Sequence, residues 1–159
     1  MIGFATINPF NAFRVVGPKI MMPTTDAETG RQFLLGRNHV GKAVYAGQSF
    51  TEGQELIRFK GPIHTRDELP ITLHDASDRY VQIGENAFMG PSDGIDDLIN
   101  HSCDPNAGLR FTDKGPVLVA LRNVSFGEEL SWDYSTTIFD HEWSMTCACG
   151  AKNCRGMIK

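Results

Sequence analysis

The four cysteines of this chain constrain its fold more than any other feature. Cys147, Cys149 and Cys154 lie together in one short, glycine-containing segment, and Cys103 lies far upstream. A disulfide between Cys147 and Cys149 would close a very small, strained ring, so any disulfide pairing would have to reach across the chain. Thiolates on a tight turn can instead converge at ~2.3 Å from one zinc ion.

This spacing favours one structural zinc ion bound by all four cysteines over two disulfides, which an exported protein would contain. A site closed by four thiolates leaves no position for a substrate, so the zinc would be structural and not catalytic. It would fasten the C-terminal tail to the loop that carries Cys103. The alternative of a secreted protein predicts two disulfides and no metal, and zinc quantification would distinguish the two.

Composition predicts one domain built mainly of β-strands. A chain of 159 residues, 41% hydrophobic and 21% charged, has the size and balance of a single globular domain. Its 16 glycines and 8 prolines indicate frequent turns, which disfavours a bundle of long helices.

Charge and hydropathy argue against nucleic acid and membranes as partners, and the N-terminal sequence argues against secretion. The net charge of −4 lacks the basic excess that drives direct binding to nucleic acid. No apolar run reaches the ~18 residues that a membrane span requires. Residues 1–20 lack the charged start and apolar core of a secretory signal. We therefore expect an intracellular protein without a membrane partner, cytoplasmic, or nuclear if it acts in a eukaryotic cell or in a host.

Short apolar stretches bounded by turn residues begin at Gln32 and are typical of strands in small β-sheets. Thr65 and Glu68 have capping-box spacing, and Pro70 limits any helix there to a turn or two. Residues 113–116 predict a hairpin turn. Strands are expected at Gln32–Leu35, Ala43–Tyr45, Glu55–Phe59, Tyr80–Ile83, Ala87–Met89, Leu109–Phe111, Val117–Leu121 and Glu129–Trp132.

Three motifs occur in order in the second half of the chain. They are Asn-His-Ser-Cys-Asp-Pro-Asn (residues 100–106), Gly-Glu-Glu-Leu-Ser-Trp-Asp-Tyr (127–134) and Cys-x-Cys-x4-Cys-Arg-Gly (147–156). Taken singly, the first suits an ordinary polar loop and the second a pair of core aromatics. Together they resemble the SET-domain protein-lysine methyltransferases with a post-SET zinc-binding tail. Residues 39–46 and 52–61 are similar to the opening segments of that family.

The resemblance implies a mainly β fold of small curved sheets around a knot-like crossing, plus the zinc-bound tail. It divides the chain into an irregular N-terminal arm (1–30), a SET domain (31–140) and a post-SET tail (141–159). The implied activity is transfer of methyl from S-adenosylmethionine to a lysine ε-amine of a protein, histone-like tails included. An overall negative charge suits such a basic target.

The resemblance also assigns site residues. Tyr134 is expected at the point of methyl transfer, with Tyr80 as a second tyrosine that also touches the cofactor. Trp132, Phe139 and Trp143 are expected to wall the lysine channel, where loss of water lowers the lysine pKa from ~10.4 and favours the neutral amine. The remaining residues expected to bind the cofactor are Gly41, Lys42, Ala43, Asn100, His101, Met157 and Ile158.

Some positions depart from the family pattern. Ala43 stands where the family has a second glycine, and Asp96-Asp97 stand where it often has a small residue and an arginine. Lys42 or Arg37 is our hypothesis for the missing charge that faces the cofactor carboxylate. The bulky Trp at the position where the family has Phe or Tyr leaves the methylation state open. These departures favour an alternative, an inactive SET-like module that binds cofactor or lysine-bearing partners, whereas the complete tyrosine, Asn-His and cysteine motifs favour the enzyme.

Overall fold

Short β-strands and three 3-10 helices make up the part of the chain that the computed structural model describes, residues 32–70, 79–138 and 143–159. The expected N-terminal arm and Phe139 lie outside these residues. The strands are β1 (Phe33–Arg37), β2 (Lys42–Ala46), β3 (Glu55–Arg58), β4 (Ile63–His64), β5 (Val81–Gly84), β6 (Ala87–Met89), β7 (Asn100–His101), β8 (Ala107–Thr112), β9 (Gly115–Ala120), β10 (Ser131–Trp132), β11 (Met145–Thr146) and β12 (Met157–Ile158). The 3-10 helices are η1 (Arg66–Glu68), η2 (Asp96–Leu98) and η3 (Tyr134–Thr136).

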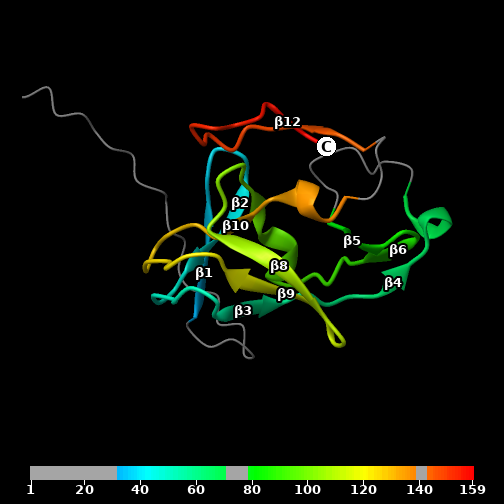
Figure 1. The fold of residues 1–159 in the computed structure, drawn as a ribbon, viewed down its shortest axis with the longest axis horizontal. Helices are drawn as coiled ribbons and strands as arrows, with labels where there is room; N and C mark the ends of the chain where they lie inside the picture. Colours follow the sequence, from blue (N-terminus) through cyan, green and yellow to red (C-terminus); the bar gives the residue numbers. More distant parts are fainter. Residues whose placement is uncertain (1–31, 71–78, 139–142) are drawn as a thin grey trace, which may run out of the picture.

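The strands form small separate sheets (Figure 1), which confirms the mainly β fold class. They include the hairpin β1-β2 and two three-stranded sheets, in the orders β3-β9-β8 and β4-β6-β5. Two further pairs are β10 with β7, which are distant in sequence, and the consecutive strands β11 and β12 of the tail. Among the described residues, no helix is long and apolar enough to cross a membrane.

Each strand expected from Gln32 onward is present, and its observed ends lie within a few residues of the expected ends. The predicted hairpin turn joins β8 to β9, where Thr112 pairs with Gly115 and leaves two residues between them. Gly115 has φ +95°, a conformation that glycine adopts without strain. The capping box before η1 is also confirmed, because Glu68 accepts a hydrogen bond from the backbone N–H of Thr65 at 2.7 Å.

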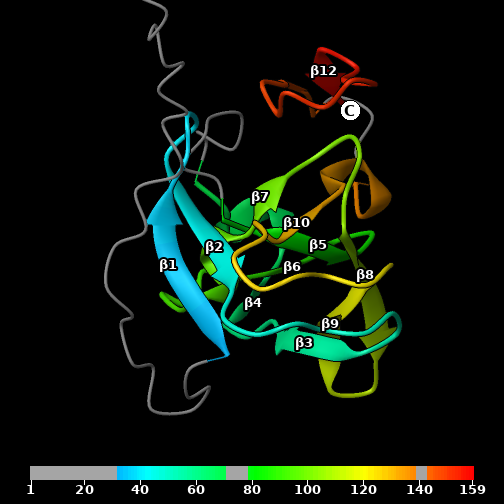
Figure 2. The same cartoon turned by 90° about the vertical axis from the view of Figure 1, so that its left-hand side faces the viewer.

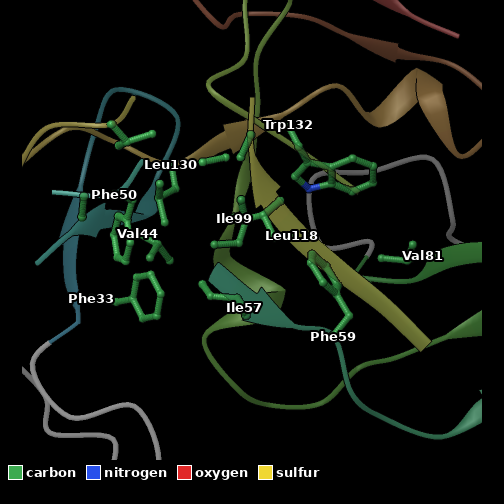
Figure 3. Packing of buried hydrophobic residues seen from close by; sticks show 14 residues of the cluster. Phe33, Val44, Phe50, Ile57, Phe59, Val81, Ile99, Leu118, Leu130 and Trp132 are labelled. Atoms are coloured by element: carbon green, nitrogen blue, oxygen red, sulfur yellow. The ribbon is translucent and has the colours of Figure 1, made fainter. Parts of the chain in front are cut away.

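The core lies between the β1-β2 hairpin and the β3-β9-β8 sheet (Figure 3). Phe33 stacks on Phe50 at a centroid distance of 5.5 Å, and Phe59 meets the Trp132 ring edge-on at 6.2 Å. Burying each such side chain stabilises the fold by about 1.5–3 kcal/mol. Within the described residues this core cluster runs from Phe33 to Trp132 and includes no part of the C-terminal tail.

One buried amide fastens the segment that leads into β10. Asn106 is only 3% exposed, and its Nδ2 donates to Glu128 Oε1 at 2.9 Å and to the Glu129 carbonyl at 2.8 Å. Its Oδ1 accepts from the Ser131 N–H at 3.0 Å. A buried amide satisfied in this way orients the backbone it binds, here residues 128–131.

The stability of the fold should depend on the ionisation of Glu128. Burial acts to raise the pKa of this carboxyl, but hydrogen bonds from Arg122, Asn106 and the Ser125 N–H outweigh it and lower the pKa. Ionised Glu128 therefore stabilises the fold above its unfolded-state pKa of ~4.3, and this is lost as pH falls through the lower folded-state pKa. We expect Glu128→Gln to cost about 1 kcal/mol near neutral pH.

Urea unfolding of wild type and Glu128→Gln across pH would measure this difference, which should shrink below about pH 4. Glu52→Gln, at an exposed position, is the control for removing one surface carboxylate. A Glu128→Gln difference that stays constant over the acid range would contradict the prediction.

Candidate active site

A cavity of about 980 Å³ is walled by both the β-domain and the C-terminal tail. Strands β7 and β10 contribute Asn100, His101 and Trp132, and η3 contributes Tyr134. The tail, which lies beyond β7 and β10 at one end of the molecule (Figure 2), contributes residues that include Ile158. The cavity is therefore assembled from segments that are far apart in sequence.

Strands β7 and β10 pair in parallel, with Asn100 opposite Ser131 and His101 opposite Trp132. These are the two segments that the family resemblance places at the crossing. Beyond β10 the backbone N–H of Tyr134 donates to His101 Nδ1 at 3.2 Å, and the Tyr134 hydroxyl donates to the Ile99 carbonyl at 2.7 Å. The Asn-His segment thus holds both ends of Tyr134.

Aromatic side chains form one wall of the cavity. The Trp132 and Tyr134 rings lie 4.8 Å apart, and Trp132 is 5% exposed. The Tyr80 ring meets the His64 ring edge-on at 5.7 Å. Tyr80, Trp132, Tyr134 and Trp143 all line the cavity, so the structure brings together the expected channel residues that it describes.

The expected cofactor residues divide into two groups. Tyr80, Asn100, His101 and Ile158 line the cavity. Gly41, Lys42, Ala43 and Met157 are not among the lining residues. Ala43 has no exposed surface and pairs with Gly36 inside the β1-β2 hairpin, whereas Met157 is 49% exposed.

The turn between β1 and β2 supplies cavity residues that sequence reasoning missed. Asn38, His39 and Val40 line the cavity, and so does Glu129. Glu129 Oε1 accepts hydrogen bonds from Asn38 Nδ2 at 2.7 Å and from Asn100 Nδ2 at 3.0 Å. The alternating pattern before Trp132 placed Glu129 on a strand, but nothing in the sequence paired it with Asn38.

The two aspartates at the position of the family arginine hold the loop before η2. Asp96 is 6% exposed and accepts hydrogen bonds from the Lys60 N–H at 2.9 Å and the Ser92 hydroxyl at 2.7 Å. Asp97 accepts from the backbone N–H groups of Ser92 and Asp93, at 3.1 and 2.8 Å. These contacts give both carboxylates a structural role.

Neither residue of our charge hypothesis reaches the cavity. Arg37 and Lys42 are exposed residues opposite each other in the β1-β2 hairpin. Lys42 contributes only through its backbone, because its carbonyl accepts from Asn100 Nδ2 at 2.9 Å. Among the described residues, Arg66 and Arg79 are the arginines that line the cavity.

The four cysteines form a cluster of free thiols. Cys147 Sγ lies 3.7 Å from Cys103 Sγ and 3.6 Å from Cys154 Sγ. The donor atoms of His101, Cys103, Cys147 and Cys149 all lie within 4.8 Å of one another. Thiolates bound tetrahedrally to zinc at ~2.3 Å are separated by about 3.8 Å, so the spacing of these sulfurs fits one zinc ion.

The imidazole ring of His101 lies next to the cysteine cluster and contacts the Cys103 sulfur. Its Nδ1 accepts a hydrogen bond from the Tyr134 N–H, which places the ring proton on Nε2. Nε2 lies 3.3 Å from Cys103 Sγ and donates to it. A protonated nitrogen cannot bind a metal, so Cys154 is the fourth ligand candidate and His101 orients the Cys103 sulfur.

Hydrogen bonds lower the pKa values of two thiols in the cluster, Cys149 and Cys103. Burial acts to raise the pKa of Cys149, but backbone N–H groups of Cys103 and Ala151 outweigh it and lower the pKa to about 6. The Cys103 pKa is lowered against burial by hydrogen bonds from Arg155. Burial raises the pKa of Cys147 to about 12. Metal ligation requires thiolates, and a bound cation would favour that form at all four positions.

Small sheets, a parallel pairing of the Asn-His strand with the tyrosine segment, and a cysteine tail closing one cavity together define a SET-domain protein. The sequence matches the SET domain family over residues 41–135, and the chain belongs to this family.

Two curated relatives illustrate this membership. The chain is 43% identical over 133 residues to histone-lysine N-methyltransferase trr of Drosophila melanogaster, covering 76% of this chain and 6% of that protein. It is 40% identical over 128 residues to the H3 lysine-4 specific histone-lysine N-methyltransferase of Saccharomyces cerevisiae, covering 72% of this chain and 12% of that protein. The chain thus spans a small part of the length of these relatives.

A solved structure shares the fold. The crystal structure of KRYPTONITE in complex with mCHH DNA, H3(1-15) peptide and SAH superposes with a TM-score of 0.63 at 22% identity. The match covers 79% of this chain and 29% of that one.

Proposed function

We propose that this chain is an S-adenosylmethionine-dependent protein-lysine N-methyltransferase. The observation that carries the proposal is that the aromatic side chains of Tyr80, Trp132 and Tyr134 line the same cavity as the Asn100-His101 pair. Relatives named histone-lysine N-methyltransferase support the same reaction, and a protein of the same fold was solved with H3(1-15) peptide and SAH.

S-adenosylmethionine, when bound, supplies an electrophilic methyl group on a sulfonium. The volume of the cavity, about 980 Å³, lies in the range of cofactor sites. Asn100, the backbone of His101 and the turn at residues 38–40 would hold the polar ends of the cofactor, and buried Ile158 would cover its adenine. Glu129 offers a carboxylate on the same wall.

The aromatic wall would prepare the incoming lysine. Water excluded from between the rings no longer solvates the ammonium, which lowers the lysine pKa and favours the neutral amine. The Tyr134 hydroxyl donates its hydrogen to the Ile99 carbonyl, so toward a substrate its oxygen can act only as an acceptor. Such an acceptor would align an amine N–H and thereby direct the nitrogen lone pair along one line.

The substrate that we propose is a basic, lysine-bearing protein segment such as a histone tail. The net charge of −4 favours association with such a segment, and the names of the relatives point to histones. A histone substrate would place the chain in the nucleus of a eukaryotic cell.

We also propose a division of the chain and one structural zinc ion. The SET domain would occupy residues 31–140 and the post-SET tail residues 141–159, after an N-terminal arm at 1–30. The tail would be held by zinc bound to Cys103, Cys147, Cys149 and Cys154. The distances between the sulfurs and the tautomer of the nearby histidine support this ligand set.

Incubation of the purified protein with methyl-tritiated S-adenosylmethionine and recombinant histones tests the activity. We expect label in at least one histone, released as methyl-lysine on hydrolysis. Protein without added histone is the control for automethylation. Cofactor binding by calorimetry without label in histones or in any protein of a nuclear extract would contradict the proposal and favour the inactive binding module.

A further inference from the structure

Arg155 follows the last cysteine and makes polar contacts with three residues of the β-domain. Its Nη2 donates to Asp133 Oδ1 at 2.6 Å and its Nη1 to the Ser135 hydroxyl at 2.9 Å. Its Nε and its backbone N–H each donate to Cys103 Sγ at 3.4 Å. One guanidinium thus joins the cysteine cluster to the two residues on either side of Tyr134.

Asp133 and Ser135 are the residues that set the backbone around Tyr134. Asp133 is the N-cap of η3, and its Oδ1 accepts from the Ser135 N–H at 3.1 Å and the Ser135 hydroxyl at 2.7 Å. A cap of this kind determines where a short 3-10 helix begins. Tyr134 is the first residue of η3, so the cap sets the backbone from which its side chain projects.

The Arg155–Asp133 ion pair is partly exposed, so we expect it to fix geometry more than to add stability. The Arg155 and Asp133 side chains are 42% and 21% exposed, and ion pairs near the surface contribute little to stability. The planar fork of arginine nevertheless fixes geometry, because its N–H groups point in set directions. Arg155 is also not among the residues that line the cavity.

We propose that Arg155 is a positioning residue that transmits the location of the cysteine cluster to Tyr134 through Asp133 and Ser135. The proposal rests on the methyltransferase function proposed above. It assigns the tail a role beyond closing the cavity, namely aiming the tyrosine at the site of reaction.

Steady-state kinetics of the zinc-containing protein test the proposal. Arg155→Gln should lower kcat about tenfold or more, with the KM for a histone peptide little changed, since a misplaced group far from the chemistry can cost up to ~100-fold. Arg155→Lys keeps the charge without the fork and should recover only part of the loss. Arg122→Gln is the matched control, because Arg122 makes a similar exposed pair with Glu128 at 2.6 Å, and it should leave kcat unchanged.

A double-mutant cycle with Asp133→Asn tests the route. If Arg155 acts through Asp133, the double variant should be no slower than the slower single variant. Losses that multiply would overturn the proposal. Zinc content is measured on each variant, and loss of zinc from Arg155→Gln would overturn it too, by showing that Arg155 supports the metal site instead.

A measurement without turnover separates this proposal from the proposed function. The chain has three tyrosines, Tyr45, Tyr80 and Tyr134, whose ring signals can be followed by NMR after 13C-tyrosine labelling. Arg155→Gln should shift the Tyr134 signals and leave those of Tyr45 in place. Unchanged Tyr134 signals would overturn the proposal, whereas a wild-type protein that methylates nothing would count against the proposed function alone.

Discussion

Cys147→Ala, or removal of zinc by a chelator, is expected to release the C-terminal tail and to lower methyl transfer by more than about 100-fold. Cys147 is buried, and its sulfur lies within 3.7 Å of the Cys103 sulfur and 3.6 Å of the Cys154 sulfur. Structural zinc contributes roughly 10–16 kcal/mol of apparent binding free energy in small domains. The two-residue strands β11 and β12 cannot replace it, because so short a pair is marginal on its own.

The β-domain should remain folded without the metal. The main core cluster within the described residues extends from Phe33 to Trp132 and draws nothing from the tail. The melting temperature should therefore fall far less than the activity does. The activity falls because the tail supplies one wall of the cavity, Ile158 included.

Colorimetric zinc release, limited proteolysis with mass spectrometry and thermal melting by circular dichroism measure these three effects. Wild type should contain one zinc per chain, and its tail should become sensitive to protease after chelation. Lys152→Ala, at an exposed position in the tail, is the control and should keep both zinc and activity. A chelated protein that retains full activity and a protected tail would rule out the structural role of zinc.

Tyr134→Phe is expected to lower kcat by about 100- to 1000-fold, the effect of losing one preorganised polar group at a reacting centre. The hydroxyl is held at 2.7 Å from the Ile99 carbonyl, so its lone pairs have a defined direction. The ring would remain against Trp132, and zinc content and cofactor affinity should therefore stay at wild-type values.

Tyr45→Phe is the matched control for the loss of stability. The Tyr45 hydroxyl also donates to a backbone carbonyl, that of Arg37 at 3.3 Å, but Tyr45 is not among the residues that line the cavity. Each substitution should cost about 1 kcal/mol of unfolding free energy. Single-turnover kinetics measure the chemical step, and an equal loss of rate in both variants would show that Tyr134 matters for folding only.

Most of the longer strands were predictable because apolar and polar residues alternate within a short stretch of sequence. Alternating apolar residues between turn residues indicate a strand wherever the chain pairs next to itself, as β8 does with β9. Strands β4, β7, β11 and β12 were not predicted, since two residues carry no periodicity. The pairing of β7 with β10 depends on segments that meet only after folding.

Of the residues that the family motif predicts for cofactor binding, the structure places only some at the cavity. The backbone of Ala43 was expected near the cofactor; the residue is completely buried inside β2, and the neighbouring turn at residues 38–40 lines the cavity. Which face of a hairpin meets the cavity depends on the partner packed against it.

The sequence by itself determined the mainly β class, the SET family and the residue types of the site, because each motif is contiguous and its chemistry follows from its members. Only the tertiary structure decided which side chains face one cavity, that His101 lies beside the cysteine cluster with its Nδ1 accepting from the Tyr134 N–H, and that Arg155 reaches Asp133. Those contacts join residues distant in sequence, and their geometry is set by the long-range packing of short strands that no local pattern encodes.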